Sequence, residues 1–278
     1  MESYNKDLSV DLNAVLASKS ERLAKFTPKF VLNWLKKVVH QNDLNSILEF
    51  SDGALDVEFA DKVLLWLNVK SNVKFTDIDS LDPKKRYIFV SNHPLGGLDG
   101  LIMISVLGKI MGKIRFVVND ILMNIVPMRS LFVPVNKHGS MGKGYGQMIH
   151  DAYASDSQIL YFPAGLCSRL IDGEIKDLEW KRNFLKQAKR YNRDIVPVHF
   201  NGRNSNFFYR LAKIRKLLGI KFNIEMIFLP DEMFRQKNSI FDITVGRPIS
   251  IESIDDSRTM EQWCAFIREE SYKLGKQQ

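Results

Sequence analysis

The sequence predicts an α/β fold, in which a mostly parallel sheet is flanked by helices and preceded by an N-terminal helical segment. Seven short apolar runs rich in β-branched and aromatic residues recur between residues 87 and 245. These runs are continuously apolar, as in strands that are buried on both faces. Helical patterns separate them, which is typical of a parallel sheet covered by helices. With 278 residues, 45% of them apolar, the chain is long enough for a full core.

The segment before residue 80 carries helical patterns. Between residues 28 and 39 the apolar side chains recur at helical spacing and include Phe30 and Trp34. Residues 19–37 hold six basic side chains and one acid, Glu21. A basic amphipathic helix with aromatic residues on its apolar face can lie in a bilayer interface. The same face can instead pack on the protein's own core, and the sequence leaves both interpretations open.

The rest of the chain alternates between strand and helix patterns. The predicted strands are 87–90, 114–118, 132–135, 159–162, 195–200, 224–229 and 243–245. The predicted helices are 100–111, 143–153, 180–191, 204–218 and 257–274. No Pro, Gly or Ser-rich linker interrupts this alternation. We therefore expect a helical segment over 1–80 and one compact α/β domain over 81–278.

Charge and cysteine content restrict the class of protein. The net charge is +8, and residues 181–221 hold twelve Lys and Arg against one acid. Such a block predicts an anionic lipid surface, an acidic carrier protein or a nucleic acid as partner, or else a solvated basic face.

Cys167 and Cys264 lie far apart without a Cys/His cluster, so we expect no disulfide, no metal site and a reducing, cytoplasmic compartment. The N-terminus lacks a signal-peptide pattern, and the apolar run 101–107 is too short to span a bilayer.

The loop after the first predicted strand contains the main candidate for catalysis. His93 lies at the carboxyl end of this strand, and Gly96, Gly97 and Asp99 follow it. Open α/β sheets place their sites at such strand ends. A carboxylate that orients the imidazole would make His93 a general base. No serine or cysteine at a nucleophile elbow accompanies the pair, so the attacking hydroxyl would come from a substrate, although a buried structural histidine is the alternative.

Two further loops carry candidate binding residues. After the strand 159–162, Gly165 frees the backbone, Ser168 offers a hydroxyl, and Arg169 offers a donor fork suited to a carboxylate or phosphate. Cys167 lies in the same loop without a neighbouring base, which favours an ordinary small residue over a nucleophile. The glycine-rich segment 136–146 carries Lys137 and fits an anion contact, but it matches neither G-x-G-x-x-G nor the P-loop.

Together these segments resemble the four motif blocks of the glycerolipid acyltransferases. The matching segments are Asn92-His93 with Asp99, Val133-Pro134-Val135-Asn136-Lys137, Phe162-Pro163-Ala164-Gly165 and Ile195-Val196-Pro197-Val198. The resemblance implies direct acyl transfer, with His93 as base and Asp99 as the residue that orients it. It also implies substrate contacts at Asn92, Gly96, Gly97, Asn136, Lys137, Phe162, Pro163, Gly165, Ser168 and Arg169.

Departures from the motif pattern narrow the resemblance. Five residues separate His93 from Asp99 where the family standard has four, and Ala164 replaces the Glu of F-P-E-G. The combination N-H-P-x-G-G-x-D-G with F-P-A-G-x-x-S-R looks more like the haemolysin-like branch, which includes O-acyltransferases of ornithine and glycine lipids. The implied acceptor is a lyso-amino-acid lipid. The implied donor is an acyl thioester on acyl carrier protein or coenzyme A, and no bound cofactor is implied.

These implications define the partners and the alternatives. We expect a peripheral protein on the inner face of the cytoplasmic membrane, with the basic stretch 181–221 docking acyl carrier protein or anionic headgroups. The alternative enzyme is a 1-acyl-glycerol-3-phosphate acyltransferase, and the Ala164 position argues against it. A nucleic-acid-binding protein would need a helix-turn-helix, RNP or zinc signature, which the sequence lacks. A catalytically silent membrane-associated scaffold of the same fold is the remaining alternative.

Overall fold

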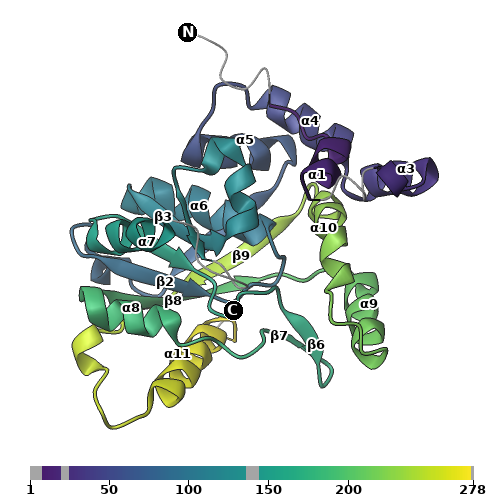
Figure 1. Ribbon diagram of the computed structural model, residues 1–278. Helices are drawn as coiled ribbons and strands as arrows, with labels where there is room; N and C mark the ends of the chain where they lie inside the picture. The colour runs from purple at the N-terminus through teal and green to yellow at the C-terminus, as the bar shows by residue number, and fades with distance from the viewer. Residues whose placement is uncertain (1–7, 20–24, 136–143, 277–278) are drawn as a thin grey trace. The chain divides into compact units, whose positions relative to one another are not determined.

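The computed structural model describes residues 8–19, 25–135 and 144–276, and these fall into two compact units (Figure 1). One unit comprises residues 1–54, 62–69 and 204–239, and the other comprises 55–61, 70–203 and 240–278. The boundaries differ from the expected 1–80 and 81–278. Residues 204–239 join the N-terminal helices, whereas residues 70–80 join the sheet.

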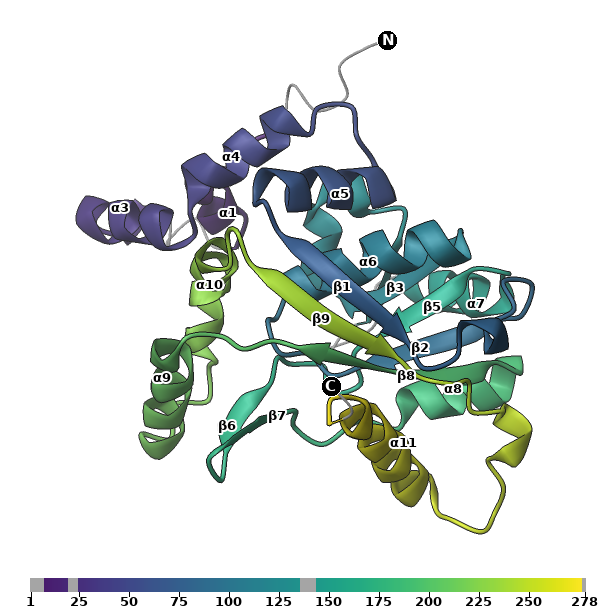
Figure 2. The same ribbon diagram turned by 180° about the vertical axis from the view of Figure 1, so that it is seen from behind.

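The larger unit contains a seven-stranded sheet, which confirms the predicted fold class. Its strand order is β1-β9-β8-β2-β5-β3-β4, and Figure 2 shows the end formed by β1, β9 and β8. Every neighbouring pair is parallel except β8 and β9. The strands are β1 (Lys70–Phe75), β2 (Tyr87–Ser91), β3 (Ile114–Asn119), β4 (Phe132–Val135), β5 (Gln158–Tyr161), β8 (Asp194–Asn201) and β9 (Ile240–Val245).

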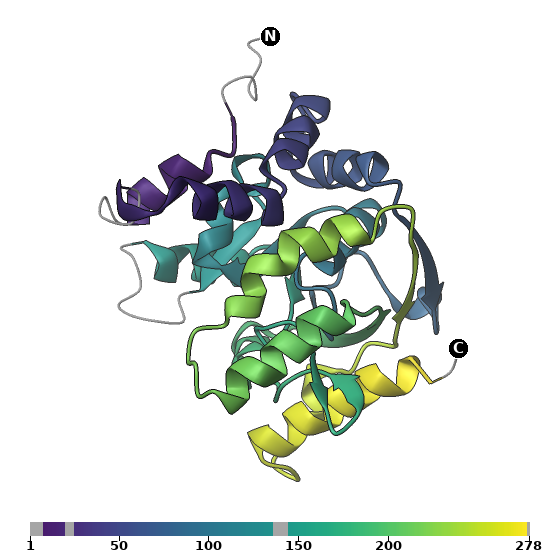
Figure 3. The same cartoon turned by 90° about the vertical axis from the view of Figure 1, so that its right-hand side faces the viewer.

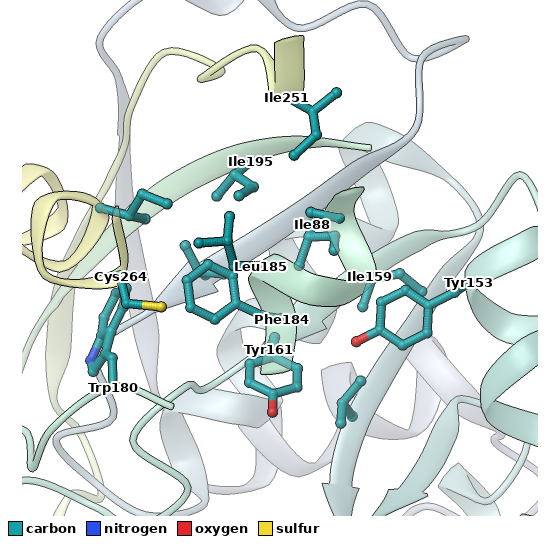
Figure 4. Packing of buried hydrophobic residues seen from close by; sticks show 14 of the residues in the cluster. Ile88, Tyr153, Ile159, Tyr161, Trp180, Phe184, Leu185, Ile195, Ile251 and Cys264 are labelled. Carbon is teal, nitrogen blue, oxygen red and sulfur yellow. The ribbon is translucent and has the colours of Figure 1, made fainter. Parts of the chain in front are cut away.

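Helices cover both faces of this sheet. The helices of the unit are α6 (Leu98–Met111), α7 (Tyr145–Ala154), α8 (Asn183–Tyr191) and α11 (Met260–Leu274). Side chains from α7, α8 and α11 form one buried cluster with Ile88, Ile159 and Ile195 of the central strands (Figure 4). On the other face α6 lies so close to the sheet that a Cβ at Gly100 would be 3.1 Å from the ring of Phe116.

The smaller unit is helical. It contains α1 (Leu12–Lys19), α3 (Lys29–Val38), α4 (Gln41–Phe50), α9 (Asn206–Leu217) and α10 (Leu229–Arg235). The boundary between the units falls within α5 (Asp56–Trp66), whose residues from Lys62 onward belong to the smaller unit. The predicted amphipathic helix is α3, but none of its residues is buried, and Phe30 is 75% exposed. The ring of Trp34 contacts that of Phe228 edge-on at 6.0 Å. The apolar face of α3 is therefore not part of a buried core.

Three differences from the predicted elements have physical causes. The predicted strand 224–229 is wrong, because these residues form a 3₁₀ turn, η4 (Ile224–Phe228), that leads into α10. A short apolar run does not distinguish strand from helix, and Pro230 favours a helix start. Strand β1 was missed because it is polar, with Lys and Asn side chains on its exposed face. The hairpin of β6 (Arg169–Ile171) and β7 (Glu174–Lys176) was also missed.

Within the described residues, no helix has both the length and the apolar character needed to cross a membrane.

Candidate active site

Three neighbouring strands bring the candidate loops to one edge of the sheet. Strand β2 pairs in parallel with β5 on one side and with β8 on the other, so Val90 lies opposite Tyr161 and Ser91 opposite Val198. Because parallel strands end at the same edge, the chain after each of them emerges in the same place. This topology brings together loops that are more than a hundred residues apart in the sequence.

His93 and Asp99 meet in the loop that follows β2. The imidazole Nδ1 lies 2.9 Å from Oδ2 of Asp99. The Asp99 side chain is fully buried, whereas the His93 side chain is 15% exposed. Because an ionised carboxylate only accepts hydrogen bonds, the pairing places the imidazole proton on Nδ1 and leaves Nε2 as an acceptor. The ring can therefore take up a proton at Nε2.

The backbone around Asp99 keeps this carboxylate ionised. Asp99 lies in the first turn of α6 and accepts hydrogen bonds from the backbone N–H groups of Leu95, Gly97 and Gly100 at 2.9, 3.0 and 3.0 Å. Burial raises the pKa of Asp99, but the charge and hydrogen bond of His93 and the N–H groups of Leu95 and Gly100 outweigh it. The net pKa is below the ordinary value.

The loop after β5 holds the imidazole from its other side. The ring of Phe162 stacks on His93 with centroids 4.1 Å apart and an interplanar angle of 15°. The chain then turns at Gly165, where φ is +65°, and the N–H of Ser168 donates to the carbonyl of His93 at 2.7 Å. The two loops are thus joined by a main-chain hydrogen bond as well as by the stacked rings.

Asp177, which sequence reasoning missed, ties these loops together. Its buried carboxylate accepts hydrogen bonds from the Ser168 hydroxyl at 2.6 Å, the Trp180 indole at 2.8 Å and the backbone N–H of His93 at 3.2 Å. Burial raises the pKa of Asp177, although these hydrogen bonds oppose the shift. No catalytic or binding motif contains this residue, and its partners come from three separate segments.

A pocket of about 260 Å³ lies at the same sheet edge, where Asn92 and Pro94, the chain neighbours of His93, line it, although His93 and Asp99 are not among its described lining residues. Its described lining residues are Asn92, Pro94, Ser168, Ile175, His199, Phe200, Asn201, Gly202, Arg203 and Tyr272. Nδ1 of His199 is buried and has no hydrogen-bond partner in the described part of the chain, and burial lowers the pKa of His199 to about 4. Within this described lining, Arg203 is the charged residue, so the pocket offers one cationic group to an anion.

The structure places the other predicted residues as follows. Gly96 and Gly97 donate backbone hydrogen bonds to Asp99. The Asn92 side chain joins β2 to β8 through two hydrogen bonds to the backbone of Phe200. The Pro163 carbonyl accepts from the backbone N–H of Lys181.

Arg169 makes its observed hydrogen bonds within its own loop, and its predicted substrate contact stays a prediction. Its guanidinium donates to the carbonyl of Cys167 at 2.7 Å, and its side chain is buried. Cys167 is fully buried, as expected for an ordinary small residue. Asn136 and Lys137 lie outside the described residues. Among the residues that are described, no group of three or more His, Cys, Asp or Glu side chains is arranged to hold a metal ion.

The chain is similar to several known proteins. A family model described as acyltransferase matches residues 14–277. A lyso-glycine lipid O-acyltransferase of Bacteroides thetaiotaomicron is 45% identical over 266 residues, which cover 95% of this chain and 97% of that protein. A protein with the same description from Phocaeicola vulgatus is 43% identical and covers 95% of both chains. The crystal structure of the 1-acyl-sn-glycerophosphate acyltransferase PlsC from Thermotoga maritima is 14% identical, with a TM-score of 0.49, and covers 96% of this chain and 97% of that one.

Proposed function

We propose, from the premise that this chain belongs to the acyltransferase family, that it transfers an acyl group from a thioester to the hydroxyl of a lyso-glycine lipid. Family membership confirms the resemblance to acyltransferases that the motif blocks indicated. The chain is an O-acyltransferase, and lysolipids are its class of acceptor. The observation that carries the finer proposal is the hydrogen-bonded pair of His93 and buried Asp99, at the same sheet edge as a pocket lined by Asn92, Pro94 and Arg203.

In this reaction His93 acts as a general base without an acyl-enzyme intermediate. Nε2 of His93 takes the proton of the acceptor hydroxyl while the hydroxyl oxygen bonds to the carbonyl carbon of the thioester. The tetrahedral intermediate then collapses, the C–S bond breaks, and the imidazolium returns the proton to the leaving thiolate. Asp99 stabilises the imidazolium between these two transfers. General-base catalysis contributes about 10²–10⁴-fold, and alignment of the two bound substrates contributes more.

The pocket supplies recognition for the acceptor headgroup. A lyso-glycine lipid ends in a carboxylate, and Arg203 offers a guanidinium suited to pair with it. His199 is neutral at physiological pH, so its imidazole adds polar contacts without a second charge. Asn201 and Tyr272 line the same pocket. A guanidinium pairs with a phosphate as well as with a carboxylate, so the preference for the glycine headgroup over glycerol phosphate is supported by the two lyso-glycine lipid O-acyltransferases that the chain resembles.

Acyl transfer by purified protein tests the base and the acceptor together. We expect wild-type protein to acylate an N-(3-hydroxyacyl)glycine in preference to lysophosphatidate, and His93→Ala to lose about 10²–10⁴-fold in kcat. His150→Ala is the matched control, since this exposed histidine contacts Tyr191 away from the pair. Full activity of His93→Ala would eliminate the mechanism, and a preference for lysophosphatidate would favour the alternative enzyme.

A headgroup variant tests the pocket separately. Arg203→Gln should raise KM for the free acid about tenfold or more, the scale of a lost charge-assisted hydrogen bond, and should change little for the methyl ester of the same acceptor. An equal loss on both acceptors would mean that Arg203 supports the structure without reading the carboxylate.

The donor is proposed to be an acyl thioester carried by acyl carrier protein. On α8 the side chains of Phe184, Leu185 and Ala188 are buried, whereas Lys186 and Lys189 are exposed, so the helix presents basic residues to solvent. An acidic carrier fits such a face. Added salt should raise KM for the carrier-bound donor more than for a neutral short-chain thioester, and equal salt sensitivity would contradict this docking. With this donor and a membrane lipid as acceptor, we propose that the enzyme works at the inner face of the cytoplasmic membrane.

A further inference from the structure

The end of α9 exposes a concentration of large apolar side chains. We call residues 213–222 the α9 tip; Figure 3 shows α9 and the loop that follows it in green. Leu217, Leu218 and Phe222 are 76%, 69% and 67% exposed, and Ile214 is 52% exposed. Large apolar side chains clustered at a surface mark sites of interaction with another body.

The tip is a built structure, because hydrogen bonds fix its backbone. Gly219 ends the helix with φ of +68°, and the N–H of Ile220 donates back to the carbonyl of Arg215. The Arg215 guanidinium donates to the carbonyl of Ile220 at 2.8 Å and forms an ion pair with fully buried Glu225 at 2.9 Å. The backbone is therefore held in a shape that directs the apolar side chains outward.

The charges around these side chains select one kind of partner. Lys213, Lys216 and Lys221 are exposed within the tip, and the sequence contains no acidic residue between Asp194 and Glu225. Apolar side chains interleaved with lysines match an anionic bilayer interface, where the former enter the acyl boundary and the latter stay among the headgroups. An acidic protein would satisfy the lysines but would leave Leu217 and Phe222 against a polar surface.

We propose that the α9 tip is a membrane-insertion element that anchors the protein to anionic lipid bilayers. The proposal extends the proposed function, because it gives an enzyme with a lipid acceptor its means of reaching the bilayer. The observations that support it all concern surface residues of the smaller unit. The membrane binding that it predicts can be measured without any acyl transfer.

Flotation of the full chain with lipid vesicles tests the anchor. We expect the protein to float with vesicles of phosphatidylcholine and phosphatidylglycerol. The triple variant Leu217→Ser, Leu218→Ser and Phe222→Ser should bind at least about tenfold more weakly, since the apolar surface that enters the interface is lost. The matched control is Leu65→Ser with Ile240→Ser, two side chains that are 66% and 61% exposed outside the tip. The control should float as wild type does.

A charge variant tests the lipid selectivity. Lys213→Gln, Lys216→Gln and Lys221→Gln together should abolish the preference for anionic over neutral phosphatidylcholine vesicles, at roughly fivefold per lysine, which corresponds to about 1 kcal/mol each. Unchanged flotation of the Leu/Phe variant would overturn the proposal. If wild type is a dimer, and the Leu/Phe variant is a monomer that still floats, the tip binds a second copy of the chain and the proposal is overturned.

Activity on a short-chain, water-soluble acceptor separates this proposal from the proposed reaction. The Leu/Phe variant should keep its turnover on that acceptor and lose turnover on vesicle-bound acceptor. If wild type shows no acyl transfer but floats with vesicles, and the Leu/Phe variant does not float, the anchor is supported and the proposed reaction is refuted. Equal loss of turnover on both acceptors would indicate damage beyond the surface and would count against an anchoring role.

Discussion

Replacing Asp99 by Asn is the most informative single change at the candidate site. The two carboxylate oxygens receive separate sets of donors. Oδ2 accepts from His93 and the N–H groups of Leu95 and Gly96, whereas Oδ1 accepts from the N–H groups of Gly97 and Gly100. An amide keeps one accepting oxygen and presents an NH₂ group in place of the other. In either orientation the NH₂ group faces two backbone N–H groups that lose their acceptor, those of Leu95 and Gly96 in one orientation and those of Gly97 and Gly100 in the other.

The structure sets the size of both expected effects. Each buried donor left without an acceptor costs about 1–3 kcal/mol, so Asp99→Asn should lower the free energy of unfolding by about 2–6 kcal/mol. If the amide oxygen turns to the two glycines, its NH₂ donates to His93 Nδ1, and the proton of the ring moves to Nε2. Because a protonated Nε2 cannot act as a base, the rate should fall by roughly 10⁴, as in other His–Asp enzymes with the wrong tautomer.

The pH dependence of stability gives a second measurement on the same variant. The lowered pKa of Asp99 means that the unfolded chain binds more protons in acid than the folded protein does. This contribution to stability is complete above the ordinary carboxyl pKa and is lost as the pH falls through the folded value. Asp99→Asn has no such titration, so its stability should depend less on pH below about 4.

Denaturant unfolding and acyl transfer by the same preparation check these expectations. Asp61→Asn is the control, since this partly exposed carboxylate contacts Lys109 and Ser105 at the surface of the same unit. The control should change stability by less than about 1 kcal/mol and leave kcat unchanged. An Asp99→Asn protein with wild-type kcat and wild-type stability would refute the role of this carboxylate.

Three smaller predictions follow from the same region. Because folding lowers the pKa of His199 to about 4, wild type should lose roughly 1.4 kcal/mol of stability per pH unit as the pH falls from 6.5 to about 4 in denaturant unfolding. His199→Gln should not show this loss. Phe162→Leu removes the ring stacked on His93 and should lower kcat up to about tenfold at saturating substrate, with KM unchanged. Gly100→Ala places a Cβ 3.1 Å from the buried Phe116 ring, and strain of about 1–3 kcal/mol, offset by the roughly 1 kcal/mol that alanine gains in a helix, should lower Tm slightly. An unchanged pH profile, kcat or Tm would contradict the respective contact.

The central strands were predictable because burial on both faces leaves a continuous apolar run. All five residues of β2 are buried, and the run 87–90 predicted that strand almost to its end. Strand β1 lies at an edge of the sheet and alternates exposed and half-buried residues, so its lysines concealed it. The apolar run 224–229 was misread, because three-dimensional context decides whether such a run becomes strand or helix.

The candidate base was predictable from the sequence because its two members lie in one loop. His93 and Asp99 are six positions apart, and the glycines between them let the chain turn back. The pocket was not predictable in this way. Arg203 and Tyr272 reach it from segments far from His93, and their meeting depends on the order of strands and on the placement of α11. Residue types and spacing contain no information about that order.

The position of Asp177 could nevertheless have been inferred from one signal in the sequence. Asp172-Gly173 joins two short runs, and both residues have positive φ, at 52° and 83°. An Asp-Gly pair between such runs is a strong sign of a two-residue hairpin. The hairpin pairs Arg169 with Lys176, which brings Ser168 beside Asp177. Because the N–H of Ser168 also donates to the carbonyl of His93, the hairpin transmits the position of Asp177 to the base, and a register shift at Gly173 should misplace both loops together.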